Sequence, residues 1–138
     1  MPGYPYSDEQ LRSLIARART IAVVGLSAAE RKASYQVAAY LKAHGFWIIP
    51  VNPTLDSVLG EKAYPALDDV PEPVDIVDVF RPGETILPIV QAALRRKFPV
   101  LWLQLGIHNQ EAENLARTAG LTVVTDRCLM IEHRRLFS

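Results

Sequence analysis

Residues 21–25 read Ile-Ala-Val-Val-Gly, and this stretch decides the fold. Its apolar residues form a continuous run, whereas a strand with one solvated face alternates apolar and polar residues. Continuous runs are typical of strands that are covered on both faces, as in a parallel sheet. Apolar residues then return at helical spacing at Val37, Ala38 and Leu41, and Gly45 supplies the expected helix stop.

A second continuous apolar run, Phe-Trp-Ile-Ile at residues 46–49, completes a βαβ unit of about 30 residues. Residues 50–53, Pro-Val-Asn-Pro, end this strand. A third strand is predicted over residues 74–80. Asp75 and Asp78 interrupt its apolar run, so one end or edge of that strand must be solvated or paired.

The rest of the chain repeats this alternation. Ser7 and Gln10 form a capping box, which predicts a first helix over residues 8–18. The remaining predicted elements are helices from Ile86 to Leu94, from a cap at Asn109 to Ala119 and from Cys128 to Phe137, with the fourth and fifth strands over residues 99–103 and 121–124.

Alternating strands and helices predict a Rossmann-like, three-layer α/β/α sandwich with right-handed crossovers. We expect its five-stranded parallel sheet to have the strand order 3-2-1-4-5, with the switch point between strands one and four. The 138 residues fit one domain, which we assign to residues 1–138. Ligands of such sheets bind beyond the carboxyl ends of the strands, at the switch point.

Composition narrows the function classes. Lys and Arg number 15 and Asp and Glu number 15, and this balance argues against a protein that neutralises nucleic-acid phosphates. The single cysteine, Cys128, excludes a disulfide within the chain, and three scattered histidines do not predict a metal site. The sequence has neither a signal-peptide pattern nor an apolar stretch long enough to span a bilayer, so we expect a cytoplasmic protein without a membrane partner.

The loop after the first strand has the features of a phosphate site. Gly25 allows a sharp turn, and residues 27–34 then offer free backbone N–H groups, hydroxyls, cations and the positive end of a helix dipole. The alternative is a solvated loop in which Ser34 caps the helix. The position directly after the first strand of a parallel sheet favours phosphate binding.

Two common phosphate ligands are poorly supported. The Gly-x-Gly-x-x-Gly fingerprint of dinucleotide sites is absent, and the second strand ends in Asn52, where NAD sites carry an acidic residue. The Walker loop of ATP-binding proteins is absent as well. An NAD-binding enzyme or regulator on the same fold remains an alternative.

Motifs at every strand end recur in a fixed order along the chain. They comprise residues 21–27, then Lys32 with Ser34 and Tyr35, then residues 50–53, 74–81, 101–107 and 126–129. Together they closely resemble the stand-alone CoA-binding domain proteins, from about residue 8 to the end of the chain. Those proteins are similar to the N-terminal CoA-binding domain of the succinyl-CoA ligase α-subunit and of ADP-forming acyl-CoA ligases.

The resemblance implies coenzyme A as the ligand. Hydroxyls of Ser27 and Ser34 and a cation of Arg31 or Lys32 would hold its phosphates, and Asn52 would avoid the repulsion that a carboxylate exerts on the ribose phosphate. The adenosine would lie between the ends of strands two and three, and the pantetheine would pass the end of strand four. The implied binding residues are Gly25, Leu26, Ser27, Arg31, Lys32, Ser34, Tyr35, Val51, Asn52, Pro53, Phe80, Arg81, Pro82, Gln104, Gly106 and Ile107.

The ligase reaction itself does not transfer with the resemblance. The ligases carry a phosphorylated histidine in a later domain, which residues up to Ser138 do not include, and their first loop is richer in glycine. We therefore expect a non-catalytic protein that binds CoA or acyl-CoA. An alternative is a detached subunit of an acyl-CoA ligase, acting with a partner chain or as a homo-oligomer.

Two further side chains have competing interpretations. Cys128 is predicted to be a small buried residue; in the alternative, Arg127 activates it and it forms a mixed disulfide with the CoA thiol. His108 could act as a general base. The sequence places neither a nucleophile nor a carboxylate beside it, so no catalysis is predicted from this residue.

Overall fold

The computed structural model describes residues 6–137. Its centre is a five-stranded sheet in which every neighbouring pair of strands is parallel. The sheet confirms the predicted Rossmann-like class, and the strands lie in the order β2 (Trp47–Val51), β1 (Thr20–Val24), β5 (Ile76–Val79), β6 (Val100–Leu103) and β7 (Thr122–Val124).

One detail of the expected strand order needs correction. The strand that we predicted as third is β5, and it pairs directly with β1, where Ile21 lies opposite Ile76. Within residues 6–137, the edge beyond β2 holds one parallel bridge, between Val51 and Tyr64. With this bridge counted as strand three, the order across the sheet is 3-2-1-4-5-6, and the switch point lies between β1 and β5. A one-residue bridge has no apolar run to mark it in the sequence.

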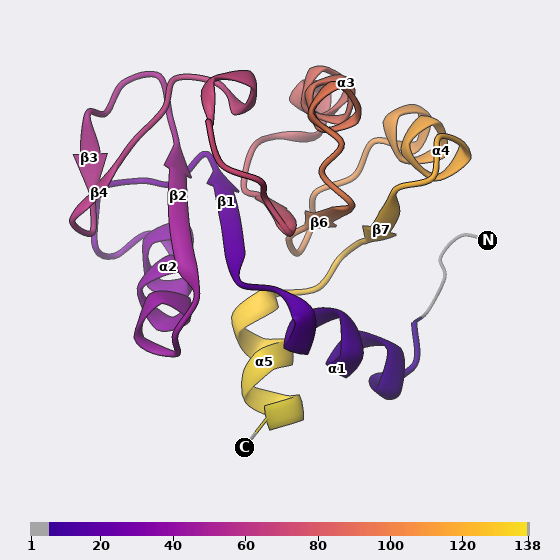
Figure 1. Ribbon diagram of the computed structural model, residues 1–138, viewed down its shortest axis with the longest axis horizontal. Coiled ribbons are helices and arrows are strands. Elements are labelled where there is room, and N and C mark those ends of the chain that lie inside the picture. Colours follow the sequence, from indigo (N-terminus) through magenta and orange to yellow (C-terminus); the bar gives the residue numbers. More distant parts are fainter. Residues whose placement is uncertain (1–5, 138) are drawn as a thin grey trace.

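Helices cover both faces of the sheet (Figure 1). On one face, apolar residues of three helices pack with β1 side chains such as Ile21 and Val23, and on the other face two helices pack with Ala22 and Val24. The first group is α1 (Asp8–Arg17), α2 (Ala33–Ala43) and α5 (Leu129–Phe137), and the second group is α3 (Ile86–Arg96) and α4 (Gln110–Thr118).

The connection between β2 and β5 contains no α-helix. It holds a two-stranded hairpin and a short turn, which pack against β2 and α3. A second short turn lies between β5 and α3. These elements are β3 (Ser57–Val58), β4 (Glu61–Lys62) and the 3₁₀ turns η1 (Leu67–Asp69) and η2 (Gly83–Thr85).

The first turn of α2 differs from those of α1 and α4 in how it is capped. The predicted capping box of α1 is present, since Gln10 N donates to Ser7 Oγ and Ser7 N donates to Gln10 Oε1. Asn109 caps α4 by accepting from Ala112 N at 3.0 Å. At α2, the cap position is Lys32, whose side chain makes no capping hydrogen bond. The N–H groups in the first turn of α2 therefore lack a capping side chain.

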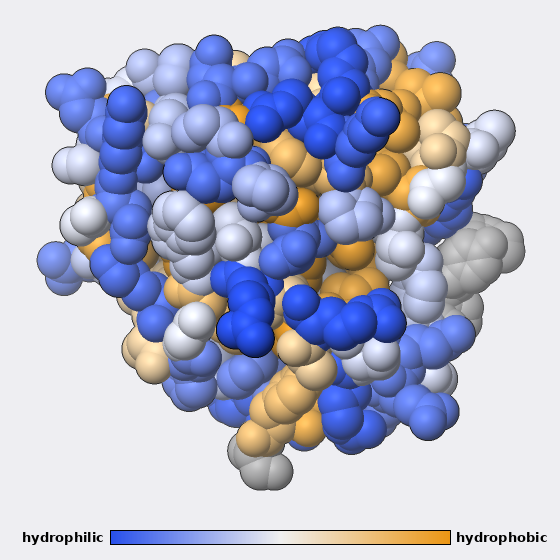
Figure 2. Space-filling view, viewed as in Figure 1, coloured by the Kyte–Doolittle hydropathy of each residue, from blue (hydrophilic) through white to orange (hydrophobic). Residues whose placement is uncertain are grey.

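The surface seen in Figure 2 is mostly polar, and apolar atoms appear between the polar side chains in separate areas. The largest exposed apolar side chains are dispersed along the chain, from Trp47 on β2 to Phe137 on α5. Among residues 6–137, no helix has both the length and the apolar character that crossing a membrane requires.

Candidate functional site

The carboxyl ends of β1, β2 and β5 meet at one end of the sheet, and a cavity of about 500 Å³ lies there. It is bounded by the loops that follow these strands, by the η1 turn and by α3. Such a volume falls in the range of small-molecule sites. The lining residues are Val24, Gly25, Val51, Asn52, Pro53, Pro65, Ala66, Leu67, Asp68, Arg81, Glu84, Thr85, Pro88, Ile89, Ala92 and Arg95.

Gly25 and Arg81 form the corner of the cavity at the switch point. Gly25 has φ +89°, a left-handed conformation that glycine adopts without strain, and its N–H donates to Val51 O at 2.8 Å. A Cβ atom at position 25 would lie 2.8 Å from Arg81 Cδ. The absence of a side chain at Gly25 thus lets the Arg81 side chain cross the end of β1.

Asn52 ties the end of β2 to the loop after β1. Its Nδ2 donates to Leu26 O at 3.0 Å, and its Oδ1 accepts from both the N–H and the hydroxyl of Thr54. Because the Asn52 amide both donates and accepts, a carboxylate at this position could not make the same set of bonds. Val51 and Pro53 flank Asn52 on the cavity wall.

The loop between β1 and α2 folds through its two serines. Ser34 Oγ accepts from Ser27 N at 3.0 Å, and Ser27 Oγ accepts from Ala29 N at 3.0 Å. Ser34 lies inside α2, so it is not the helix cap that the alternative interpretation required. Each hydroxyl is the acceptor in its bond, so neither bond uses the hydrogen atom of the hydroxyl. Arg31 and Lys32 are exposed in this loop.

The cavity brings together Gly25, Val51, Asn52, Pro53 and Arg81 of the predicted set. Leu26 is fully buried, and its carbonyl rather than its side chain faces Asn52. The remaining predicted residues lie in the adjoining loops or in the core and do not line this cavity: Leu26, Ser27, Arg31, Lys32, Ser34, Tyr35, Phe80, Pro82, Gln104, Gly106 and Ile107.

One wall of the cavity has no counterpart in the sequence prediction. Leu67 and Asp68 of η1 face α3, and Arg95 donates to Asp68 Oδ2 at 2.5 Å. This hydrogen bond is the main cause that lowers the pKa of Asp68 and raises the pKa of Arg95. Prolines in residues 54–73 indicated an irregular segment, but only the tertiary structure shows that it closes the site.

Asp78 and Gln104 are buried side by side where β5 and β6 end. Gln104 Nε2 donates to Asp78 Oδ1 at 2.6 Å, and Asp78 Oδ2 has no hydrogen-bond partner. Asp78 is 0% exposed and Gln104 is 4% exposed. Burial raises the pKa of Asp78 to about 7, although the bond from Gln104 lowers it. The interruption that Asp78 makes in the apolar run is therefore a paired, inward-facing carboxyl.

His108 has carboxylates beside it that the sequence did not reveal. Its Nδ1 lies 3.7 Å from Glu113 Oε2, and its Nε2 lies 3.9 Å from Asp126 Oδ1. Asp126 also accepts from Gly106 N at 2.9 Å. Within residues 6–137, no group of three or more His, Cys, Asp or Glu side chains is arranged to hold a metal ion.

Cys128 is 7% exposed and belongs to the apolar cluster on the face of α1, α2 and α5. The preceding residue, Arg127, pairs with Glu132 at 3.1 Å. Its carbonyl accepts from Trp102 Nε1 at 2.8 Å. Burial agrees with the prediction of a small core residue, and the mixed disulfide with CoA stays a prediction.

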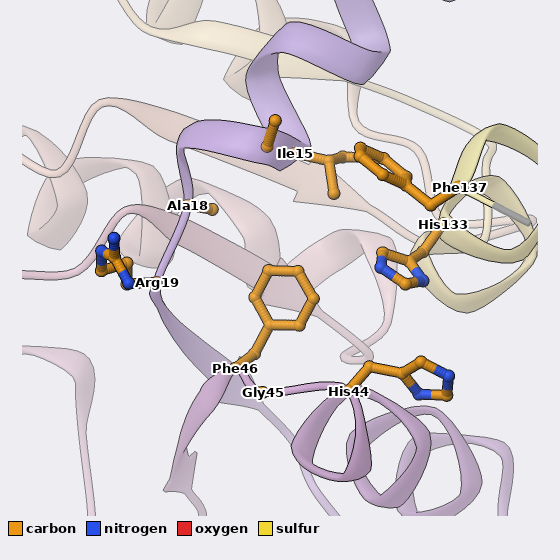
Figure 3. Close-up of a pocket in the computed structure, with 9 residues that line it drawn as sticks. Ile15, Ala18, Arg19, His44, Gly45, Phe46, His133 and Phe137 are labelled. Atoms are coloured by element: carbon orange, nitrogen blue, oxygen red, sulfur yellow. The ribbon is translucent and has the colours of Figure 1, made fainter.

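A second, smaller cavity of about 280 Å³ lies at the amino ends of β1 and β2 and contains none of the predicted site residues. Figure 3 shows the Phe46 ring between Arg19 and His133. His133 Nδ1 and the hydroxyl of Tyr40 are 2.8 Å apart. Burial, and then the proximity of His44, lower the pKa of His133.

Comparison with known proteins identifies the domain family. The family model described as CoA binding domain matches residues 19–134, which include all of the loops around the cavity at the switch point. The chain belongs to the CoA binding domain family. This membership confirms the resemblance drawn from the strand-end motifs.

Two relatives show how the domain occurs elsewhere. The chain is 38% identical over 127 residues to the uncharacterized protein YneT of Bacillus subtilis (strain 168), covering 92% of this chain and 94% of that protein. It is 34% identical over 96 residues to acetate–CoA ligase [ADP-forming] II of Archaeoglobus fulgidus. That match covers 68% of this chain and only 14% of the ligase.

Solved structures show the same two cases: small proteins matched over nearly their whole length, and a longer enzyme matched over a part of its length. A hypothetical protein from Pyrococcus horikoshii OT3 superposes with a TM-score of 0.96 at 36% identity, covering 100% of this chain and 97% of that one. A protein from Thermus thermophilus gives a TM-score of 0.92 at 40% identity and covers 96% and 100%. A dinucleotide-forming acetyl-coenzyme A synthetase of Ca. Korarchaeum cryptofilum gives 0.69 at 26% identity, covering 82% of this chain and 27% of the synthetase.

Proposed function

We propose that this CoA-binding family member binds coenzyme A or an acyl-CoA and performs no chemistry on it. The observation that carries the proposal is the cavity at the switch point, where Gly25, Asn52 and Arg81 meet. The domain family supplies the ligand class, and the position agrees with the general rule for ligands of doubly wound sheets.

In this proposal the cavity takes the adenosine part of the ligand. Val51 and Pro53 provide apolar surface on one side, and Leu67 and Ile89 provide it on the other. The Arg81 guanidinium, which forms no ion pair within residues 6–137, is available to a phosphate. Asn52 supports the assignment because an amide at this place does not repel a ribose phosphate.

The loop between β1 and α2 would hold the diphosphate. Its support is the uncapped first turn of α2, together with the hydroxyls of Ser27 and Ser34 and the exposed cations Arg31 and Lys32. Uncapped N–H groups at a helix start attract anions both by hydrogen bonding and through the helix dipole. This loop adjoins the cavity at Gly25, so the diphosphate and the adenosine can be bound together.

The pantetheine arm would leave the cavity across the end of β5 and pass the turn after β6. Neighbouring strands lie about 4.8 Å apart, so an extended arm passes one strand end after another as it crosses the sheet. Gln104, Gly106 and Ile107 form this turn, in which Ile107 N donates to Gln104 O at 3.1 Å. Phe80 and Pro82 flank the path at the end of β5.

Thermal unfolding tests the ligand class. We would compare the melting temperature alone and with CoA, acetyl-CoA, NAD or ATP at equal concentration. A ligand that binds only the folded state stabilises it by about 2.7 kcal/mol at a hundredfold excess over its dissociation constant. We expect a clear shift with CoA and acetyl-CoA, and little with NAD. A shift with NAD alone, or with none of the four, would contradict the proposal.

Variants of the loop locate the site. Lys32→Ala and Ser27→Ala should reduce the shift that CoA produces, because each removes a group assigned to the diphosphate. Arg17→Ala is the matched control, since Arg17 is an exposed cation in the last turn of α1, at the other end of the sheet. Incubation with acetyl-CoA, followed by measurement of free thiol, tests for hydrolysis, and we expect none above the uncatalysed rate.

A further inference from the structure

In the buried Asp78–Gln104 pair, one oxygen of the Asp78 carboxyl has no hydrogen-bond partner, and core packing does not require such a group. A buried carboxyl with one unpartnered oxygen is unfavourable unless its surroundings use it. Asp78 lies between Val23 of β1 and Trp102 of β6, and all three side chains face the α1, α2 and α5 side of the sheet. An apolar residue would fit these neighbours better than a carboxyl does.

Gln104 is fixed at more than one point. Its N–H donates to Val79 O at 3.3 Å, its carbonyl accepts from Ile107 N, and its Nε2 donates to Asp78. The amide oxygen accepts no hydrogen bond within residues 6–137. Unlike Asp78 Oδ2, it is not among the fully buried polar atoms that lack a partner, so it keeps a small exposed area although Gln104 as a whole is 4% exposed. Asp78 thus holds the nitrogen of the amide, and the oxygen is the end of the amide that has no hydrogen bond among the described residues.

We propose that Asp78 is a positioning residue of the CoA site: it orients the Gln104 amide so that the amide oxygen accepts a hydrogen bond from an N–H of the ligand's pantetheine arm. This inference rests on the proposed function, because it assigns a role within the same site. It identifies the recognised chemistry as an amide N–H, which adenosine nucleotides without the arm do not have at this place.

The protonation state of Asp78 determines how firmly the amide is held. A carboxylate only accepts hydrogen bonds, so it pairs with Nε2 and leaves the Gln104 oxygen unbonded. A carboxylic acid also donates, so it can pair with either end of the amide, and this orientation is no longer enforced. Because burial raises the pKa of Asp78 to about 7, both forms are present near neutral pH.

His108, Asp126 and Glu113 lie at the turn after β6, and any effect of their ionisation is common to the wild type and Asp78→Asn, so it cancels when these two proteins are compared. The elements packed around Asp78 carry Tyr35 on α2, Cys128 before α5, and Arg127 with Glu132, which pair with each other. Neighbouring strands contribute only the uncharged Val23 and Trp102. Burial and the Gln104 bond are the two causes of the pKa shift of Asp78, and no charged side chain adds to them.

Calorimetric titration with two ligands tests the proposal. CoA carries the pantetheine arm, and adenosine 3′,5′-bisphosphate lacks it. We would measure both dissociation constants at about pH 6 and about pH 8 for the wild type, Asp78→Asn, Gln104→Ala and the control Glu111→Gln, an exposed carboxylate on α4. Ligand ionisation cancels when variants are compared at one pH. Unfolding curves at each pH would confirm that every variant is folded.

The wild type and Glu111→Gln should bind CoA about threefold to tenfold more tightly at the higher pH, which is the range for one hydrogen bond. The bisphosphate should not show this gain, and neither Asp78→Asn nor Gln104→Ala should show it with CoA. A gain that persists in Asp78→Asn, or one equal for both ligands, would overturn the inference. If neither ligand binds the wild type, the proposed function fails; if both bind without an arm-specific gain, only this inference fails.

Discussion

The Arg81 side chain crosses the end of β1 directly over Gly25, so close that a Cβ atom on residue 25 would lie 2.8 Å from Arg81 Cδ. The contact joins the two loops that diverge at the switch point. Residue 25 is therefore constrained twice, by its left-handed backbone and by the space that Arg81 occupies.

Gly25→Ala should lower the free energy of unfolding by about 1–2 kcal/mol, because an alanine at a positive φ is strained. It should also weaken CoA binding, since the new methyl group displaces Arg81. Denaturant unfolding and calorimetric titration measure the two effects. Gly120→Ala is the control: Gly120 has φ +100°, and a Cβ there meets no atom within 4 Å. This control should lose stability and keep its affinity, so equal losses of affinity would contradict the role given to Arg81.

Asn52→Asp should discriminate between ligands that differ only in the ribose phosphate. The substitution replaces the donor to Leu26 O with a negative oxygen, and places a charge where the 3′-phosphate of CoA is proposed to lie. We expect the affinity for CoA to fall by about tenfold or more, and the affinity for dephospho-CoA to fall less. Raising the salt concentration should narrow the difference. An equal loss for both ligands would place the phosphate elsewhere.

Asp78→Asn should change how stability depends on pH. The folded state holds a proton on Asp78 up to about pH 7, whereas an unfolded aspartate loses it near its ordinary pKa of 3.8. Between these values the folded state binds more protons, so stability falls as the pH rises, by up to about 4 kcal/mol. The asparagine variant should lack this decline and exceed the wild type in stability at pH 8. Parallel curves for the two proteins from pH 4 to 8 would refute the assignment.

Asn109→Ala should destabilise the protein by about 1–2 kcal/mol, because it removes the cap of α4 and the bond from Asn109 Nδ2 to Gly83 O. That second bond holds the turn before α3, where Glu84 and Thr85 line the cavity. CoA affinity should therefore fall as well. Ser7→Ala removes the cap of α1, away from the cavity, and should lower stability alone. If both variants retain full affinity for CoA, the role given to the bond between Asn109 and Gly83 is wrong.

Strand ends were the informative part of the sequence. Gly25 and Asn52 directly follow β1 and β2, and Arg81 follows β5 after one intervening residue; parallel strands bring their carboxyl ends to one edge. The wall formed by Asp68 and Arg95 could not be found this way. Its residues come from an irregular segment and from a helix surface, and neither has a periodic pattern that points toward a ligand.

The sequence prediction also missed the one-residue bridge at the edge of the sheet, for a related reason. The bridge between Val51 and Tyr64 occupies one residue on each side, and so leaves no apolar run by which to number the strands. Similarly, Asp126 and Glu113 reach His108 from different loops and helices. Their proximity depends on how β6 and β7 align, which composition and spacing do not encode.

The first and last described helices, α1 and α5, pack against each other (Figure 1), and neither contributes a residue to the cavity at the switch point. Arg135 forms two hydrogen bonds of 2.9 Å with Asp8, and Arg12 Nε donates to Leu136 O at 3.3 Å. The described part of the chain thus begins and ends with helices that lie away from the loops proposed to bind the ligand. Fluorescent labels on the exposed faces of these two helices would leave the entrance to the switch-point cavity unobstructed, which makes the helices suitable positions for a reporter of the proposed ligand binding.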